Sequence, residues 1–235
     1  MENLDHLGIH ELSQGQLEAV SPHFVKAKLL SAQEKSWEVF QTIRENLREG
    51  MTEGTARKKA IEIFSDFGVK KHWHQPYIRF GRGTALTFND PLQLENPLLY
   101  GSGVSMDLGP IWPDDEINLG FEGDVGDSFA FGVHEEFEKC ASTCRQLFQE
   151  VRSEWRTRRW TGQEIYQFLN TRAQSLGYVL APKVEGHRIG DFPHHKYSRE
   201  NLANLKFHPN VTLWVLEVQV NDPDSRFGAF FEDIL

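Results

Sequence analysis

The sequence predicts an α+β domain built from two related halves. Two segments with helical spacing of apolar residues precede short β-type segments rich in glycine and phenylalanine, and this order then occurs a second time. The predicted helices Thr52–Gly68 and Thr161–Gly177 have the same length, begin with threonine, end with glycine and are offset by 109 positions. This pattern favours one domain with an internal repeat and a site between its halves.

The composition is that of a folded protein with an acidic balance. The chain has 235 residues, 39% of them hydrophobic, and a formal net charge of −9. The acidic balance argues against a dedicated nucleic-acid binder and against docking on an anionic membrane. The N-terminus has no signal-peptide pattern, and no apolar run approaches the ~18 residues that a membrane span needs. We therefore expect a cytoplasmic protein without a nucleic-acid or membrane partner.

The first half is predicted as follows. Residues 1–30 have weak periodicity and are expected to form an N-terminal arm, so that the domain covers residues 31–235. Ser31–Glu49 has an amphipathic helical pattern, and Thr52 and Gly68 suit the N-cap and the C-terminal end of a second helix. The strand candidates of this half are Pro76–Phe80, Thr84–Phe88, Val104–Leu108, Ile117–Phe121 and Val125–Phe131.

The second half repeats this order. His134–Arg158 predicts a long helix, and after the helix that begins at Thr161 a loop region from residue 181 to 209 leads to the strands Val211–Val220 and Phe227–Ile234. Cys140 and Cys144 lie four positions apart in the long helix. Two buried thiols on a core-facing stripe are the usual arrangement for such a pair, and a metal or redox role is the alternative.

Four carboxylates interrupt otherwise apolar strand patterns: Asp107, Asp124, Glu217 and Glu232. A buried carboxylate costs several kcal/mol unless it is neutralised, paired or metal-bound. Salt bridges to arginine or lysine are one interpretation, but these strands carry few basic residues, which favours bound cations. His187 offers a nitrogen ligand, and one histidine with several carboxylates suits Mn, Fe, Co or Zn. Two such ions would hold a shared hydroxide as a nucleophile.

The order Asp, Asp, His, Glu, Glu resembles that of the pita-bread metallopeptidases, which include methionine aminopeptidase, aminopeptidase P, prolidase and creatinase. The segments that carry the resemblance are Val104–Pro110, Gly120–Asp124, Gly186–Gly190, Trp214–Glu217 and Phe227–Asp233. The resemblance extends from about Ser31 to the C-terminus. It implies a pita-bread fold, in which a pseudo-twofold helix-helix-sheet repeat surrounds a curved antiparallel sheet.

The resemblance also implies roles for individual residues. Two divalent metal ions would be bound by Asp107, Asp124, His187, Glu217 and Glu232. Asp124 and Glu232 would be the bridging pair, and Glu217 would take the proton from the metal-bound water. His194 matches a second histidine of the family, which contacts the substrate and steadies the tetrahedral intermediate.

The sequence departs from the family pattern at three places. Asp107 and Asp124 are 17 residues apart, and Trp112–Glu116 looks like an inserted tip, in which Asp114 or Asp115 is an alternative first ligand. The family places a substrate-facing histidine near Asn89, and His74, with His72, is a candidate to replace it in substrate binding. The alternative for these two histidines is an exposed position at the start of a strand. Lys183 stands near the place of a further histidine of prolidase and aminopeptidase P.

These features predict a dinuclear metal-dependent hydrolase that resembles an aminopeptidase and removes an N-terminal residue or cleaves Xaa-Pro bonds with a metal-bridging hydroxide. A second hypothesis is a creatinase-like or lyase reaction on a small non-peptide molecule. A third is a non-catalytic binding module of the same fold, against which the cost of unused buried carboxylates argues. The expected partner is a peptide or small-molecule substrate, and the resemblance leaves a homodimer open.

Overall fold

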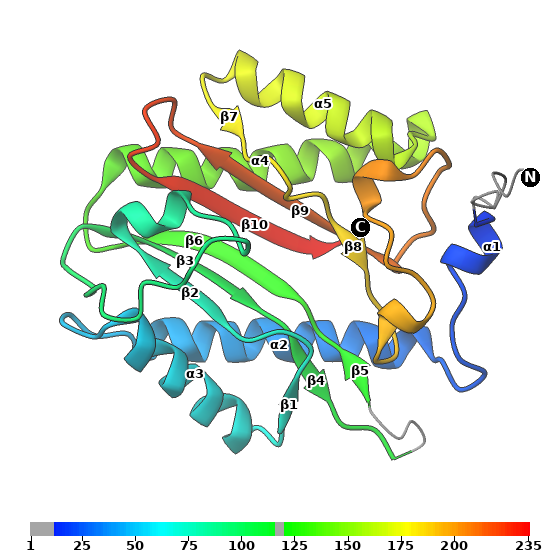
Figure 1. Cartoon of the computed structure of the whole chain (residues 1–235), viewed down its shortest axis with the longest axis horizontal. Helices are drawn as coiled ribbons and strands as arrows, with labels where there is room; N and C mark the ends of the chain where they lie inside the picture. The colour runs from blue at the N-terminus through cyan, green and yellow to red at the C-terminus, as the bar shows by residue number, and fades with distance from the viewer. Residues whose placement is uncertain (1–11, 116–119) are drawn as a thin grey trace, which may run out of the picture.

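The computed structural model describes residues 12–115 and 120–235, which form a large antiparallel sheet covered by helices (Figure 1). The sheet has seven strands in the order β2-β3-β6-β10-β9-β7, and β8 also pairs with β9. These strands are β2 (Tyr77–Phe80), β3 (Ser102–Leu108), β6 (Val125–Phe131), β7 (Val179–Leu180), β8 (His187–Arg188), β9 (Trp214–Asn221) and β10 (Gly228–Ile234). The α+β class predicted from the sequence is confirmed.

A second, three-stranded sheet contains the insertion between Asp107 and Asp124. Its strand order is β1-β4-β5, and the strands are β1 (Lys71–His72), β4 (Pro110–Trp112) and β5 (Phe121–Glu122). The predicted tip is therefore the end of a β4-β5 hairpin, although residues 116–119 lie outside the described part of the chain. Most of the predicted strand Ile117–Phe121 falls on them, and its described end, Phe121, begins β5.

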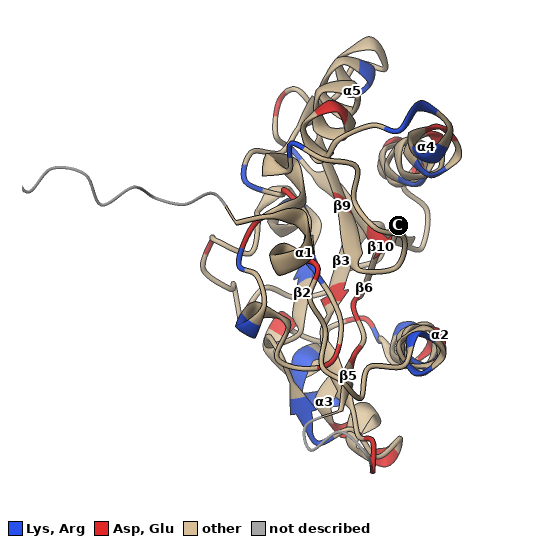
Figure 2. Ribbon diagram, turned by 90° about the vertical axis from the view of Figure 1, so that its right-hand side faces the viewer, with Lys and Arg blue, Asp and Glu red and all other residues tan. Residues whose placement is uncertain are grey.

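Five α-helices are described: α1 (Gln14–Leu17), α2 (Lys26–Asn46), α3 (Glu53–Asp66), α4 (Glu135–Arg158) and α5 (Gly162–Ser175). Figure 2 shows that the two long helices, α2 and α4, lie on the same side of the large sheet. Three short 3₁₀ helices, η1 (Gly81–Ala85), η2 (His194–Lys196) and η3 (Leu202–Asn204), lie in the connections. No helix of the described residues is long and apolar enough to cross a membrane.

The internal repeat is visible in α3 and α5, which both have 14 residues. Thr52 and Thr161 are their N-caps, and each threonine accepts a hydrogen bond from the backbone N–H three positions on, at 3.2 Å. Each helix also has a reciprocal side-chain bond to the backbone of its N-cap, so that both begin with a capping box. The same local chemistry thus starts the second helix of both halves, as the sequence predicts.

The faces of the sheet follow from the alternation of side chains. Leu216 and Val218 of β9 lie in one hydrophobic cluster with residues of α4 and α5, and Met106 of β3 lies in another with residues of α2 and α3. Since successive side chains of a strand point to opposite faces, Glu217 and Asp107 point away from these helices. The carboxylates therefore lie on the face that α2 and α4 leave uncovered.

The N-terminal segment and one predicted strand differ from expectation. The first long helix begins at Lys26 instead of Ser31, and the segment before it packs on the second half, where Glu18 accepts a hydrogen bond from Trp214 Nε1 at 2.9 Å. Thr84–Phe88 is not a strand, because η1 and a turn occupy this region. Thr84 Oγ1 donates to the carbonyl oxygen of Gly81 at 2.7 Å, and this local bond replaces pairing with a neighbouring strand.

Cys140 and Cys144 are free thiols inside the core, which confirms the structural interpretation of this pair. Cys144 Sγ donates to the carbonyl oxygen of Ala229 at 2.9 Å. Burial raises the pKa of Cys140 to about 12, so this thiol stays protonated at neutral pH.

Candidate metal centre

Three of the predicted ligands lie in one row across four strands of the large sheet. Asp107 of β3 pairs with Gly126 of β6, Gly126 pairs with Glu232 of β10, and Glu232 pairs with Glu217 of β9. Residues that pair across antiparallel strands point to the same face. Strand register therefore brings the three carboxylates together, although more than one hundred residues separate the first from the last.

Asp124 is the most deeply buried aspartate of the group, with 1% of its surface exposed. It lies between β5 and β6, and both its backbone N–H and its carbonyl oxygen are hydrogen-bonded to the Gln33 side chain of α2. Asp124 N–H donates to Gln33 Oε1 at 2.9 Å, and Gln33 Nε2 donates to the Asp124 carbonyl oxygen. Both oxygens of the Asp124 carboxylate are buried without a hydrogen-bond partner. The backbone of Asp124 is thus fixed in place, and its carboxylate faces the imidazole nitrogens of His187 and His74.

His187 faces Asp124 with a defined tautomer. Its Nδ1 lies 2.6 Å from the carbonyl oxygen of Arg188, and because a carbonyl only accepts, Nδ1 carries the proton. The other ring nitrogen, Nε2, lies 2.8 Å from Asp124 Oδ2 without hydrogen-bond geometry. In a neutral ring this contact sets a lone pair against a carboxylate, so it requires either a second proton on the ring or a cation. Burial opposes that proton, but the Asp124 charge outweighs burial and raises the pKa of His187 to about 9.

Glu217 and Glu232 are buried neighbours in the row. Glu217 Oε2 accepts a hydrogen bond from the N–H of Gly186 at 2.8 Å, while Glu232 Oε1 is buried without a partner. Burial and the nearby aspartates raise the pKa of Glu217 to about 7 and also raise that of Glu232. Removal of a proton from either group is therefore unfavourable without a positive charge close by.

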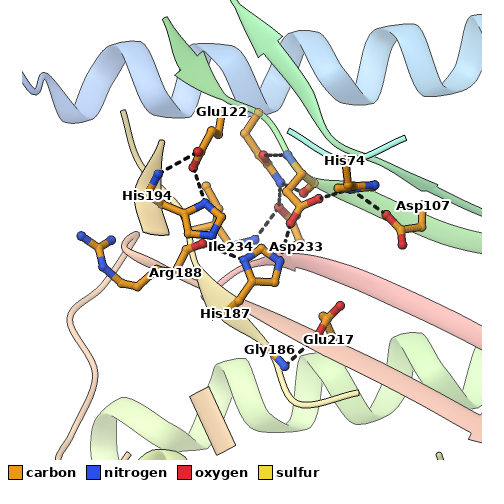
Figure 3. Close-up of polar contacts among 12 residues, drawn as sticks. His74, Asp107, Glu122, Gly186, His187, Arg188, His194, Glu217, Asp233 and Ile234 are labelled. Atoms are coloured by element: carbon orange, nitrogen blue, oxygen red, sulfur yellow. Dashed lines mark hydrogen bonds and ion pairs between the residues drawn. The ribbon is translucent and has the colours of Figure 1, made fainter. Parts of the chain in front are cut away.

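His194 is also at this site, and its partner is Glu122, which has no exposed surface. Glu122 Oε2 lies 2.9 Å from His194 Nδ1, and Glu122 Oε1 accepts a hydrogen bond from the His194 backbone N–H at 3.0 Å (Figure 3). Because an ionised carboxylate only accepts, His194 Nδ1 carries a proton. Its Nε2 is then the ring nitrogen available to a ligand.

His74 reaches the centre from the loop between β1 and β2. Its Nε2 lies 3.2 Å from Asp107 Oδ1 and 3.5 Å from Asp124 Oδ1 (Figure 3). His72, in contrast, packs against Phe64 at a ring distance of 5.0 Å. The two histidines therefore do not share a face, and only His74 joins the predicted ligands.

A cavity of about 480 Å³ opens onto these residues. All five predicted metal ligands belong to its lining, together with His74, His194 and His195. Asn89 is not among the described residues that line the cavity, because it lies in an exposed turn. Its neighbour Phe88 does line the cavity, as does Lys183.

Two residues with clear positions at the site had no predicted role: Glu122 and Trp73. The Trp73 ring lies 4.3 Å from the ring of His74, 4.8 Å from that of His187 and 5.2 Å from that of His194. The Trp73 ring thus contacts all three imidazoles of the site. Trp73 directly precedes His74, and Glu122 lies within the segment Gly120–Asp124 that carries the second aspartate. This proximity is the only feature of the sequence that could have pointed to them.

The described residues include two groups that could hold a metal ion. One contains His74, Asp107 and Asp124, and the other contains Asp124, His187 and Glu232. Asp124 is common to both. Asp114, the alternative first ligand, instead forms an ion pair with Lys28 of α2 at 2.9 Å, and Asp115 is exposed.

Comparisons with known proteins place the chain in a family and a fold. The model of metallopeptidase family M24 matches residues 27–235. A comparison with curated proteins finds no match.

Solved structures show the same fold. A prolidase from Thermococcus sibiricus is 17% identical with a TM-score of 0.72, and the match covers 88% of this chain and 55% of that one. An X-Pro aminopeptidase from Thermotoga maritima is 14% identical with a TM-score of 0.74, and the match covers 94% of this chain and 60% of that one. A methionine aminopeptidase from the same organism is 15% identical with a TM-score of 0.69, and the match covers 92% of this chain and 93% of that one. The chain thus spans little more than half the length of the prolidase. The pita-bread fold predicted from the sequence is confirmed.

Proposed function

Because the chain belongs to metallopeptidase family M24, we propose that it is a hydrolase that cleaves peptides near their N-terminus with two divalent metal ions. The chain's own ligands in this proposal are Asp107, Asp124, His187, Glu217 and Glu232.

The observation that carries the proposal is the buried Asp124 carboxylate, whose ion-pair contacts within the described residues are two imidazole nitrogens. Both of its oxygens and Glu232 Oε1 are buried without a hydrogen bond, and His187 Nε2 lies 2.8 Å from Asp124 Oδ2, where the ring needs either a second proton or a cation. A buried carboxylate costs several kcal/mol unless its charge is offset, either by a protonated imidazole or by a bound cation. A divalent cation offsets the carboxylate charges and accepts the histidine lone pair at the same time.

The donor set supports particular ions. Carboxylate oxygens with one or two imidazole nitrogens suit borderline divalent metals, and we propose Mn, Fe, Co or Zn. In each of the two candidate groups, one ligand atom of every member lies within 4.8 Å of the others. Sharing of Asp124 between the groups suits a bridging ligand.

The proposed chemistry divides between the ions and the protein. Divalent ions in such a site lower the pKa of bound water and polarise a carbonyl group. Glu217 is the proposed proton acceptor: Gly186 holds its Oε2, and we assign Oε1 to proton transfer. His194, whose Nδ1 is held by Glu122, presents Nε2 to the substrate oxygen that becomes negatively charged.

The cavity supports a small peptide substrate. Its volume of about 480 Å³ lies in the usual range for small-molecule sites, and Trp73, Tyr77 and Phe88 contribute aromatic surface to its lining. Lys183 and Arg199 add positive charge at the same cavity. These features suit a peptide that presents an apolar side chain and a carboxylate.

The test is a release assay on a panel of Xaa-Pro and Met-Xaa peptides, combined with metal analysis of the purified protein. We expect turnover of at least one peptide class, about two bound ions, and loss of both in Asp124→Ala and Glu232→Ala. Asp127→Ala is the matched control, because Asp127 lies on β6 next to Gly126 but pairs with Arg145 of α4 on the helix-covered face, at 2.9 Å.

The outcomes separate the parts of the proposal. A protein that binds none of these metals contradicts the assigned site. A protein that binds two ions but turns over no peptide of the panel contradicts the peptidase activity and favours a reaction on a small non-peptide molecule.

A further inference from the structure

His74 has a fixed tautomer. Its Nδ1 lies 2.8 Å from the carbonyl oxygen of Gln75, and since that oxygen only accepts, Nδ1 carries the ring proton. In the neutral ring, Nε2 therefore has a lone pair, and this nitrogen is the one that faces the carboxylates. His187 has the same arrangement, with Nδ1 held by the Arg188 carbonyl oxygen.

In its neutral form, the His74 ring completes a group of three acceptors. Its Nε2 is 3.2 Å from Asp107 Oδ1 and 3.5 Å from Asp124 Oδ1, and the latter oxygen is buried without a hydrogen-bond partner. Two ligands that are each about 2.1 Å from one ion, at a tetrahedral angle, are about 3.4 Å apart. The separations at His74 are thus those of atoms that share one cation.

The ring is held in this position by its neighbours. The Tyr77 ring stacks on it at 5.7 Å, and the Trp73 ring packs edge-on at 4.3 Å. Gly109 makes room for both, because a Cβ atom at this position would lie 2.4 Å from His74 Nε2 and 2.4 Å from Trp73 Nε1. The His74 side chain is only 16% exposed. The imidazole is therefore placed before any ligand arrives.

We propose that His74 is a ligand of the metal ion that Asp107 and Asp124 hold, so that each of the two ions has one imidazole ligand. This inference rests on the proposed metal centre and extends it by a sixth protein ligand. The role expected for His74 from the sequence was contact with the substrate. As a metal ligand, His74 would have the same role as His187, and Asp124 lies between the two histidines.

The added imidazole changes the metal preference of one position. Without His74, this ion would have carboxylate ligands only, which suit Mn and Mg. With His74, the set includes nitrogen, which favours Zn, Co and Fe. Replacement of His74 is therefore expected to weaken binding of Co²⁺ or Zn²⁺ more than binding of Mn²⁺.

The first experiment measures Co²⁺ binding to metal-free protein by equilibrium dialysis and calorimetry. We expect two binding steps in the wild-type chain and a loss of about tenfold or more in the affinity of one step in His74→Ala. His195→Ala is the matched control, because it removes another imidazole from the same cavity lining. Circular dichroism checks that each variant is folded.

A second measurement uses the unaltered protein, so that it does not depend on how His74→Ala folds. In NMR spectra of the Co²⁺-loaded chain, each coordinated histidine gives a strongly shifted ring N–H signal that is absent in D₂O. We expect two such signals, one from His74 and one from His187. A folded His74→Ala variant should lose one of them.

The failure of this inference is distinguishable from the failure of the proposed function. Two bound Co²⁺ ions with a single shifted N–H signal, or unchanged affinities in His74→Ala, overturn the role of His74 and leave the metal centre intact. No Co²⁺ binding by the wild-type chain overturns the metal centre itself.

Discussion

Glu122 receives both the backbone N–H and the ring Nδ1 of His194, at 3.0 and 2.9 Å, and its Oε2 also accepts a hydrogen bond from Gly190 N–H at 3.1 Å. Both carboxylate oxygens thus face N–H donors. This buried pair connects β5, next to Asp124, with the loop that follows His187. Glu122 is therefore a positioning residue for the imidazole that we assign to substrate contact.

Replacement of Glu122 should impair turnover without loss of metal. In Glu122→Gln the amide nitrogen must face one of the N–H donors, so we expect a loss of about 1–3 kcal/mol in the free energy of unfolding. Loss of the fixed His194 tautomer should lower kcat by about ten- to hundredfold. Urea unfolding, kinetics and metal analysis check these points, and a kcat equal to that of the wild type would contradict the positioning role.

Replacement of Gly126 by a residue with a side chain should be unfavourable, because Gly126 pairs with Asp107 on one side and with Glu232 on the other. A Cβ atom there would lie 2.8 Å from Glu232 Oε1 and 2.4 Å from Phe230 Cε1. We expect Gly126→Ala to lower the free energy of unfolding by about 1–3 kcal/mol and to weaken metal binding. The control is Gly15→Ala, where no atom lies within 4 Å of the added Cβ. Equal thermal stability and equal metal affinity of the two variants would contradict this account.

Arg188 should couple the N-terminal segment to the histidine loop. The buried guanidinium donates to the carbonyl oxygens of Leu17 and Ala19, at 2.9 and 2.7 Å, and to those of Ile189 and Leu213, at 2.6 and 2.9 Å. Lysine cannot reproduce this set of donors. We expect Arg188→Lys to cost about 1–3 kcal/mol of stability in the full chain.

The same substitution should cost less in a chain that starts at residue 23, because two of the four acceptors are then absent. Chemical unfolding of the four proteins gives the coupling energy directly. If Arg188→Lys costs the same in both chains, the N-terminal segment does not support the loop.

Metal-free protein should lose stability as the pH rises. The folded-state pKa of Glu217 is raised to about 7 by burial, and that of His187 is raised to about 9 because the Asp124 charge outweighs burial. Stability from groups with raised pKa values is fully present below their unfolded pKa and is lost as the pH passes the folded value. The lowered pKa of Asp124 acts in the opposite direction, but only in acid, near its ordinary value of 3.8.

We therefore expect the melting temperature of the metal-free chain to fall by several degrees between about pH 6 and pH 9. Added Co²⁺ or Zn²⁺ should raise it more at the upper end of this range, because protons no longer compete for the ligands. Thermal unfolding with and without metal measures both effects. A metal-induced increase that shrinks as the pH rises would contradict the ligand assignment.

The sequence indicated most residues of the candidate metal centre because their signals are local. Asp107, Glu217 and Glu232 each interrupt an apolar alternation, and such an interruption is visible within a few residues. The capped helices Thr52–Gly68 and Thr161–Gly177 were predicted for the same reason, since an N-cap threonine and its partner are three positions apart.

The remaining parts depend on contacts between distant segments. Nothing near Glu122 in the sequence indicates that it holds His194, 72 positions later. Asn89 was placed by analogy with the family, but it lies in an exposed turn, whereas the imidazole beside Asp107 is that of His74. Thr84–Phe88 has strand-like residues, yet a hydroxyl bonded to Gly81 favours the 3₁₀ turn.

The position of β10 has a consequence for how the protein is made. β10 is the last strand in chain order, yet it lies between β6 of the first half and β9 of the second. A nascent chain therefore presents an unpaired β6 edge until the final strand has left the ribosome, and an exposed edge of this kind is prone to pair with other chains. Both halves close around one late segment, which also carries Glu232. We therefore expect the sheet and the candidate metal centre to be completed together during folding.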